Sequence, residues 1–528
     1  MRTAILSLLL VVVTLPSPAN AQEHRCGHQT LNALTPWEAP PWTGPVKGGR
    51  GLPTIGDQRI FWIYDLSEMP PKNEAVAATC RGTGARSAVW VGDADWGTKV
   101  DQTAVDNILA ALEEATPRTP EAGIIQGNLS LFGLPPHFAT GDPDLSVLVY
   151  SLEGYKGTLF DGYFRAEDLQ PFNPSCQTSA GLYCSNELGM IHLNADDPGS
   201  DYMIGVVAHE FQHMIHFARD PYEEAWVNEA MSELAMVWHG YEDPGNLGFY
   251  AQHPDAPLVI QDFVDYGAVL LFGAYLEERL GPEGITALVA DTLTGLSGVK
   301  AHLPAELTWE GLFGQWVAAN VLDAPAAGDG EYGYQLVEVP AFATESLGAV
   351  PLDTQATVPA SAGGYYTLDV TDVPFDETLT VTFDPLGSGS VAHAVLPGTV
   401  RVLQLPAGEE IVLPLEMAVP ELQLTASNPG NAPAVVRFVI DSVFMPGPEP
   451  TPEPGPEPAE DDVVTGPGPD TVAGEDTVAG PDTVTEDPAN GGGGGCTRSG
   501  EAAGGPLALL LGLVLAGALL RPRRREEP

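Results

Sequence analysis

The sequence predicts an α+β protein, in which a mixed-sheet subdomain and a helical subdomain are followed by a small all-β sandwich. Strand-like and helix-like segments alternate between about residues 59 and 194. The hydrophobic spacing is helical between about residues 200 and 322, and short apolar runs separated by turn residues follow from residue 365. We therefore expect a first domain at residues 59–325 and a β-sandwich domain at residues 345–443.

The first part of this chain contains three runs rich in β-branched and aromatic residues, and we expect strands there, at residues 60–64, 87–91 and 145–150. A further strand, followed by turn-forming residues, is expected at 189–194. A helix is expected over residues 105–114, because Ile108, Leu109 and Leu112 can share one of its faces.

The helical part begins after the start signal at residues 197–200, which precedes a helix at 203–218 that Asp220-Pro221 ends. A second helix is expected at 223–239, with Gly240 as its C-terminal stop. Two more are expected at 267–280, ended by Gly281-Pro282, and at 309–322.

Short apolar strands make up the third part, between Pro, Gly and Asn turns, at residues 365–370, 379–383, 400–405, 422–426 and 435–440. A sandwich of this kind binds substrate or serves as a spacer, and the pattern does not choose between the two.

The N-terminus has the features of a secretory signal: Arg2, an apolar stretch at 4–15 and a small-residue cleavage site at 19–21. A buried structural helix is the alternative. We expect residues 1–21 to be removed and residues 22–58 to form a propeptide or a structural arm.

The C-terminal region differs in composition. Residues 446–495 are rich in Pro, Gly, Asp, Glu and Thr, which predicts a disordered acidic linker. Cys496 is followed by the apolar stretch 506–520 and then by four arginines. This arrangement resembles the C-terminal sorting signals of myxobacterial surface proteins. The resemblance implies that a sorting protease and the export machinery process residues 496–528 and that the protein reaches the cell surface or is released. A plain single-pass membrane anchor through 506–520 is the alternative.

The net charge of −49 excludes a nucleic-acid-binding function, since little positive charge is present to neutralise phosphates. Export makes the cysteines candidates for disulfides. Cys176 and Cys184 flank a short loop and are expected to pair, and Cys26 and Cys80 are a second plausible pair.

The chemistry is concentrated in the motif H-E-x-x-H at residues 209–213. On a helix, His209 and His213 share one face and can present both imidazoles to one zinc ion. Zinc lowers the pKa of a bound water toward about 7, and Glu210 can take the proton of that water.

The third ligand comes from a resemblance. Residues 226–233, Trp-Val-Asn-Glu-Ala-Met-Ser-Glu, resemble the second zinc signature of the gluzincins, the thermolysin-like clan. This implies Glu229 as a zinc ligand, with Glu233 and Asn228 supporting the ligands. A metzincin would need Gly and His where this chain has His216 and Arg219.

Together with residues 209–215 and 266–272, this segment resembles the hyicolysin-like neutral metallopeptidases. The resemblance covers about residues 60–322. It implies a zincin-type catalytic domain and a secreted, surface-anchored zinc endopeptidase that acts on extracellular proteins or peptides.

Such enzymes need a hydrogen-bond donor to the oxyanion, and we take Tyr266 as the catalytic candidate, with a packing role as the alternative. An extended substrate is expected to add along strand 189–194. The alternative function is a catalytically inactive zincin-fold surface or adhesion protein. A calcium ion is not supported, since no calcium-loop spacing is present.

Overall fold

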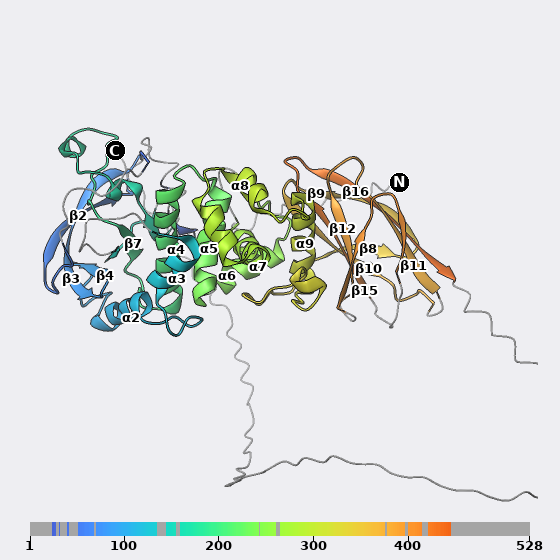
Figure 1. Ribbon diagram of the computed structural model, residues 1–528, viewed down its shortest axis with the longest axis horizontal. Coiled ribbons are helices and arrows are strands. Elements are labelled where there is room, and N and C mark those ends of the chain that lie inside the picture. Colours follow the sequence, from blue (N-terminus) through green and yellow to red (C-terminus); the bar gives the residue numbers. More distant parts are fainter. Residues whose placement is uncertain are drawn as a thin grey trace, which may run out of the picture. The chain divides into compact units, whose positions relative to one another are not determined.

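The computed structural model describes a large part of the chain, namely residues 24–27, 31, 40–41, 51–67, 70–134, 144–154, 159–241, 243–259, 265–374, 377–396, 400–413 and 421–444. These residues form an α+β architecture with one seven-stranded sheet, eight α-helices and two smaller sheets, as predicted (Figure 1). The predicted signal, linker and C-terminal segments lie outside the described residues.

The seven-stranded sheet has the order β1-β6-β7-β5-β4-β3-β2. It is mixed: β1 pairs with β6, β5 with β7 and β4 with β5 in parallel, whereas the other neighbours are antiparallel. Its strands are β1 (His24–Cys26), β2 (Gln58–Asp65), β3 (Lys72–Thr83), β4 (Ser87–Gly92), β5 (Leu145–Tyr150), β6 (Phe160–Phe164) and β7 (Met190–Asn194).

Alternation along the inner strands separates the two faces of this sheet. Val147 on β5 and Ile191 on β7 belong to the main core, which the helices share. Leu148 and Met190, one position along, belong to a separate core on the opposite face. The four predicted strands of this region and its predicted helix are confirmed to within three residues at each end.

Helices cover one face of the sheet, and Figure 1 shows α4 between β7 and α5. The α-helices are α2 (Gln102–Glu113), α3 (Ile124–Phe132), α4 (Asp201–Arg219), α5 (Ala225–His239), α6 (Pro244–Gln252), α7 (Tyr266–Ala290), α8 (Gly295–His302) and α9 (Trp309–Leu322).

Local sequence determines where the two central helices begin and end. The Ser200 side chain accepts a hydrogen bond from the backbone N–H of Met203 and caps α4, which ends before Asp220. Gly240, at φ +83°, adopts the left-handed conformation that terminates α5. Residues 203–216 of α4 are all buried, so this helix lies in the interior between the sheet and α5.

The predicted end of one helix is only half right. Gly281 leaves the helical conformation at φ +70°, but Pro282 begins a second helical segment that carries α7 on to Ala290. Proline is well tolerated at a first helical position, so it restarts the helix after this kink.

The last part is a sandwich of two sheets, with strand orders β13-β12-β15-β10-β8 and β14-β11-β16-β9. Leu424 of one sheet and Phe438 of the other belong to the same hydrophobic core. The strands are β8 (Glu345–Ala349), β9 (Leu352–Val358), β10 (Ala362–Asp369), β11 (Glu377–Asp384), β12 (Val391–Leu396), β13 (Arg401–Leu405), β14 (Glu410–Leu413), β15 (Glu421–Asn428) and β16 (Ala434–Phe444).

One of the two expected disulfides is present. Cys176 and Cys184 are bonded, as predicted. The expected pairing of Cys26 with Cys80 is wrong, since neither forms a disulfide. Cys26 lies on β1 and Cys80 on β3, five strands apart in the sheet order. At about 4.8 Å per strand this is roughly 24 Å, whereas bonded cysteines need Cα atoms within about 7 Å.

The expected substrate strand is also wrong. The strand at 189–194 corresponds to β7, which is hydrogen-bonded on both sides, to β5 and β6, and therefore has no open edge. The strand beyond it is β6, and β1 covers the outer side of β6. Within the part of the chain that is described, no helix is long and apolar enough to cross a membrane.

Candidate metal centre

Helices α4 and α5 bring together the three residues that were predicted as metal ligands, His209, His213 and Glu229. The Nε2 atoms of His209 and His213 lie 3.1 Å apart. One carboxylate oxygen of Glu229 lies 3.3 Å from Nε2 of His209, and the other lies 3.5 Å from Nε2 of His213. All three side chains are buried, so the group is closed off from solvent.

Cys26 adds a fourth donor that the sequence did not lead us to expect. Its Sγ lies 3.3 Å from Nε2 of His213. The four donor atoms lie within 4.8 Å of one another. A tetrahedral ion with bonds of about 2.0–2.3 Å holds its donor atoms about 3.3–3.8 Å apart, so this group has a size suitable for a metal ion.

Acceptor atoms at the far side of each imidazole favour the form of the two histidines that binds metal. Nδ1 of His213 lies 2.9 Å from Oδ1 of Asn228 and 3.0 Å from the Ser232 hydroxyl. Nδ1 of His209 lies 3.2 Å from a carboxylate oxygen of Glu233. Because an acceptor faces each Nδ1, a proton is favoured there, and Nε2 of each ring faces the group and is the atom that would bind a metal.

The electrostatics of the group favour a cation. Burial alone lowers the pKa of His209, but the neighbouring carboxylates of Glu229 and Glu233 outweigh burial and raise this pKa to about 10. Both oxygens of Glu229 are buried, and neither accepts a hydrogen bond of normal geometry from a described residue. At this pKa, His209 would carry a second proton at neutral pH in the absence of a metal, beside the buried carboxylate of Glu229. A metal ion would take the place of that proton, so the residues fit a metal ion.

Glu210 lies beside this group without being one of its four donors. Its carboxylate is fully buried, and burial raises its pKa to about 7, with His209 acting in the opposite direction. The Cys26 side chain and the backbone of Phe164 on β6 also act to lower this pKa.

Gly162 on β6 allows this close approach. A Cβ built on Gly162 would lie 2.9 Å from Cγ1 of Val206 and 3.2 Å from Cγ of Glu210. Any larger residue would push α4, and Glu210 with it, away from the sheet. The sheet therefore holds the candidate base in place through a glycine contact.

Tyr266 opens α7 at the edge of the group. Its hydroxyl makes a long contact of 3.5 Å with the backbone carbonyl oxygen of Cys26, and its ring centroid lies 6.5 Å from that of His209. Burial raises the pKa of Tyr266 well above its usual value, with Glu229 adding to the effect, so the hydroxyl keeps its proton and remains a donor.

Sequence reasoning missed three contributors to this centre. Ser232 was inside the matched segment, and its spacing of three from Glu229 could have drawn attention to it. Gly162 and Cys26 gave no local signal, because both act through strand pairing between segments far apart in the chain.

A second buried polar cluster lies among β6, β7 and the turn after β6. Arg165 forms an ion pair with Asp168, which also lies 2.8 Å from Nε2 of His192. Burial raises the pKa of Asp168, but Arg165 and His192 outweigh burial and lower it to about 2. This cluster is internally neutralised, which distinguishes it from the metal group.

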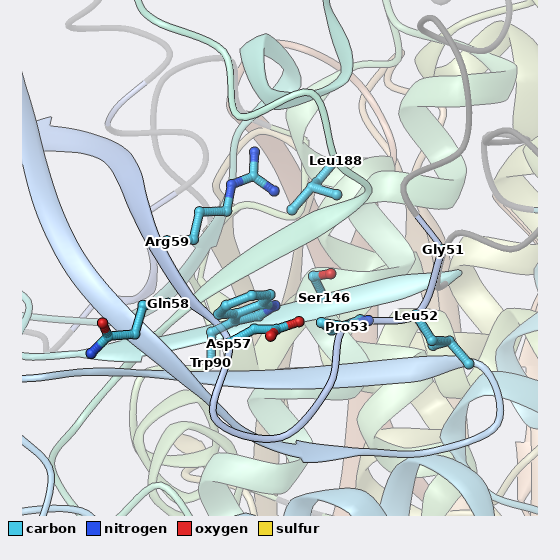
Figure 2. Close-up of a pocket in the computed structure, with 9 residues that line it drawn as sticks. All are labelled: Gly51, Leu52, Pro53, Asp57, Gln58, Arg59, Trp90, Ser146 and Leu188. Carbon is cyan, nitrogen blue, oxygen red and sulfur yellow. The ribbon is translucent and has the colours of Figure 1, made fainter.

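A pocket of about 320 Å³ has Asp57, Arg59, Trp90, Ser146 and Leu188 among its lining residues (Figure 2). Trp90 and Leu188 belong to the core on the sheet face opposite the helices. Its lining includes none of the metal-group residues, so this pocket is separate from the candidate centre.

Comparison with known proteins adds no family. No family model matches the chain, and no curated protein matches it either. Among solved structures, a de novo designed double-stranded β-helix matches with 13% identity over 17% of this chain and 99% of its own, at a TM-score of 0.13. A GH115 4-O-methyl-α-glucuronidase with specificity for decorated arabinogalactans matches with 9% identity over 56% of this chain and 51% of its own, at a TM-score of 0.13. Likenesses at this TM-score carry no argument about fold or function.

Proposed function

We propose that this chain is a secreted, surface-anchored zinc endopeptidase with a zincin-type catalytic domain. The observation that carries the proposal is the position of Glu210, a buried carboxylate beside the metal group that is not one of its four donors. A structural metal site has no use for such a carboxylate, whereas hydrolysis needs a base next to the attacking water.

Zinc is the ion we assign to the group. Two imidazoles, a carboxylate and a thiolate are ligands typical of zinc, and the donor separations suit tetrahedral geometry. When bound, zinc would polarise the peptide carbonyl and make a water acidic enough to attack at neutral pH.

The protein residues have distinct tasks in this proposal. Glu210 accepts the proton of the attacking water and then donates it to the departing amine. Tyr266 donates a hydrogen bond to the oxyanion, which its raised pKa allows at all physiological pH values. Asn228 and Glu233 keep the imidazoles oriented.

The substrate would pair with the outer edge of β6, in the position that β1 takes in this structure. This strand lies directly beside α4, and Gly162 places its backbone next to Glu210. An extended peptide added there as a further strand would bring one of its carbonyl groups to the metal group. Proteins and peptides outside the cell are thus the proposed substrates.

One observation favours the alternative, an inactive metal-stabilised surface protein. Cys26 completes a four-donor set, and closed four-donor sets are typical of structural zinc sites. The alternative leaves the buried Glu210 without a role, so we prefer the peptidase.

The test compares the full chain, Cys26→Ala and the double variant Cys26→Ala/Glu210→Gln, each loaded with zinc, on casein and a peptide library. We expect hydrolysis in Cys26→Ala and a loss of activity in the double variant with zinc still bound. No hydrolysis in any zinc-loaded protein, or equal hydrolysis with and without Glu210, would reject the peptidase and leave the structural alternative.

A further inference from the structure

We propose that Cys26 is the fourth metal ligand and that strand β1 is a built-in inhibitor, which keeps the enzyme latent until this segment leaves the site. This inference rests on the proposed function and adds its regulation. Three separate contacts carry it: one to the metal group, one to the substrate-binding edge and one to the oxyanion donor.

The sulfur of Cys26 occupies the place that an attacking water needs. It lies 3.3 Å from Nε2 of His213 and also interacts with the neighbouring carboxylate of Glu210. A water activated for hydrolysis must touch both the metal and the base. While the sulfur holds this position, the fourth coordination site is filled and the base has no water to activate.

The backbone of β1 occupies the edge that substrate would use. Cys26 lies opposite Gly162 in the parallel pairing of β1 with β6, and the N–H of Gly27 donates to the carbonyl oxygen of Gly162 at 2.8 Å. A peptide cannot add to this edge of β6 while β1 is paired with it.

Tyr266 is engaged by the same segment. Its hydroxyl faces the carbonyl oxygen of Cys26 at 3.5 Å, so a carbonyl of the chain itself stands where a substrate carbonyl would be held. One segment thus occupies three places that a substrate complex would need. The Cys26 sulfur lies at the metal group, strand β1 pairs with the edge of β6, and the Cys26 carbonyl faces Tyr266.

The donors other than Cys26 are suited to bind a metal ion by themselves. The buried oxygens of Glu229, without hydrogen bonds of normal geometry from described residues, point at the two imidazoles from α4. The cysteine therefore completes a site whose other donors come from separate elements, and its removal leaves three ligands and an open position.

Activation is a ligand exchange without electron transfer. With a metal bound, release of the Cys26 thiolate would leave a position that a water could take, and the free thiolate would be trapped outside the site. With a small organomercurial chloride as the trap, a sulfur–mercury bond forms and chloride leaves the reagent. A catalytic site with three protein ligands and one open position is what remains.

The experiment uses the full chain, Cys26→Ala and, as a matched control, Cys80→Ser, which replaces another buried cysteine that forms no disulfide. We expect Cys26→Ala to hydrolyse peptides at least about tenfold faster than the unmodified chain, the ratio that a 1.4 kcal/mol preference for the bound thiolate produces. The organomercurial should activate the unmodified chain and Cys80→Ser, and should leave Cys26→Ala unchanged.

A readout other than activity separates this inference from the proposed function. With Co²⁺ in place of zinc, a thiolate ligand produces a near-ultraviolet charge-transfer band. We expect this band in the unmodified chain and in Cys80→Ser, and its loss in Cys26→Ala. Absence of the band from the unmodified chain overturns the inference even if the chain is an active peptidase. If the unmodified chain shows the band but Cys26→Ala does not hydrolyse peptides, the inhibitory role and the peptidase are both overturned. A structural metal site is then left.

Discussion

The sulfur of Cys26 lies 3.3 Å from Nε2 of His213, although 187 positions separate the two residues in the chain. The contact joins the first strand of the sheet to the central helix α4. It exists because β1 pairs with β6 and β6 packs on α4, so an N-terminal segment of three residues reaches the centre of the molecule. The metal group therefore holds together three segments, β1, α4 and α5.

Metal removal should accordingly lower the thermal stability. An ion present at about 1,000 times its Kd stabilises the folded chain by about 4 kcal/mol. Differential scanning calorimetry should show a lower Tm for chelator-treated chain than for zinc-loaded chain. His209→Ala should abolish the zinc-dependent shift in Tm. His253→Ala should retain this shift, because His253 is exposed and directly follows the last residue of α6. Equal Tm values with and without zinc would contradict a folded-state metal site.

Replacement of Glu233 should weaken metal binding without removing a ligand. Glu233→Gln loses the charge that orients His209 through its Nδ1 atom at 3.2 Å. Partners of this kind are worth about 10- to 100-fold in metal affinity. Competition with a chromogenic chelator measures the effect. The control is Glu277→Gln, which replaces a different buried carboxylate, on helix α7. A similar loss in both variants would mean that Glu233 has no specific role at the site.

The parts of the centre that the sequence predicts are those encoded locally. His209 and His213 share a helix face, and Glu229 with Asn228 and Glu233 follow on the next helix, so the helical repeat alone brings each set together. The structure brings these residues close together because no long-range pairing is needed to form either set.

The parts that were missed depend on pairing between distant strands. β1 is three residues long and shows no periodic pattern, and β6 contains Gly162 and Asp161, which weaken any strand signal. Without β6, the strand at 189–194 looked like an edge, and Cys26 looked like a disulfide partner for Cys80. Both errors have the same origin, because the order β1-β6-β7 at one side of the sheet cannot be inferred from the local sequence.

Gly162→Ala should destabilise the fold and disturb the base. The new Cβ would meet Cγ1 of Val206 at 2.9 Å and the backbone oxygen of His192 at 3.0 Å. Overpacking of this kind costs about 1–3 kcal/mol. Gly248→Ala, in α6 with open space around its Cβ, should instead stabilise by about 0.5–1 kcal/mol through helix propensity. Urea denaturation measures both. A neutral Gly162→Ala would show that α4 and β6 pack less closely than described.

Asp168 should make the stability depend on acid pH. Its pKa is about 2 in the folded chain, against about 3.9 in an unfolded chain. A lowered folded-state pKa stabilises the protein above about pH 4, and this contribution, roughly 2 kcal/mol, is lost as the pH falls from about 4 to 2. Asp168→Asn should therefore flatten the fall in unfolding free energy over this range.

The matched control for Asp168 is Asp353→Asn, which removes an exposed carboxylate paired with Arg437. Screening by solvent makes that pair weak, so its loss should leave the acid dependence close to that of the unmodified chain. Unfolding free energies from urea titrations at pH 5, 3 and 2 compare the three proteins. If Asp168→Asn keeps the full acid dependence, then Arg165 does not hold that carboxyl in its charged form.

Tyr266→Phe tests the oxyanion donor in the Cys26→Ala background, where the site is expected to be open. Loss of one such donor lowers kcat by about 10²–10³ and changes KM little, because the bond forms fully only as charge develops on the carbonyl oxygen. Tyr275→Phe lies on the same helix, bonds the backbone oxygen of Glu331 and serves as the control. A rise in KM with unchanged kcat would assign Tyr266 to substrate binding instead, and equal effects of both substitutions would assign it to packing of α7.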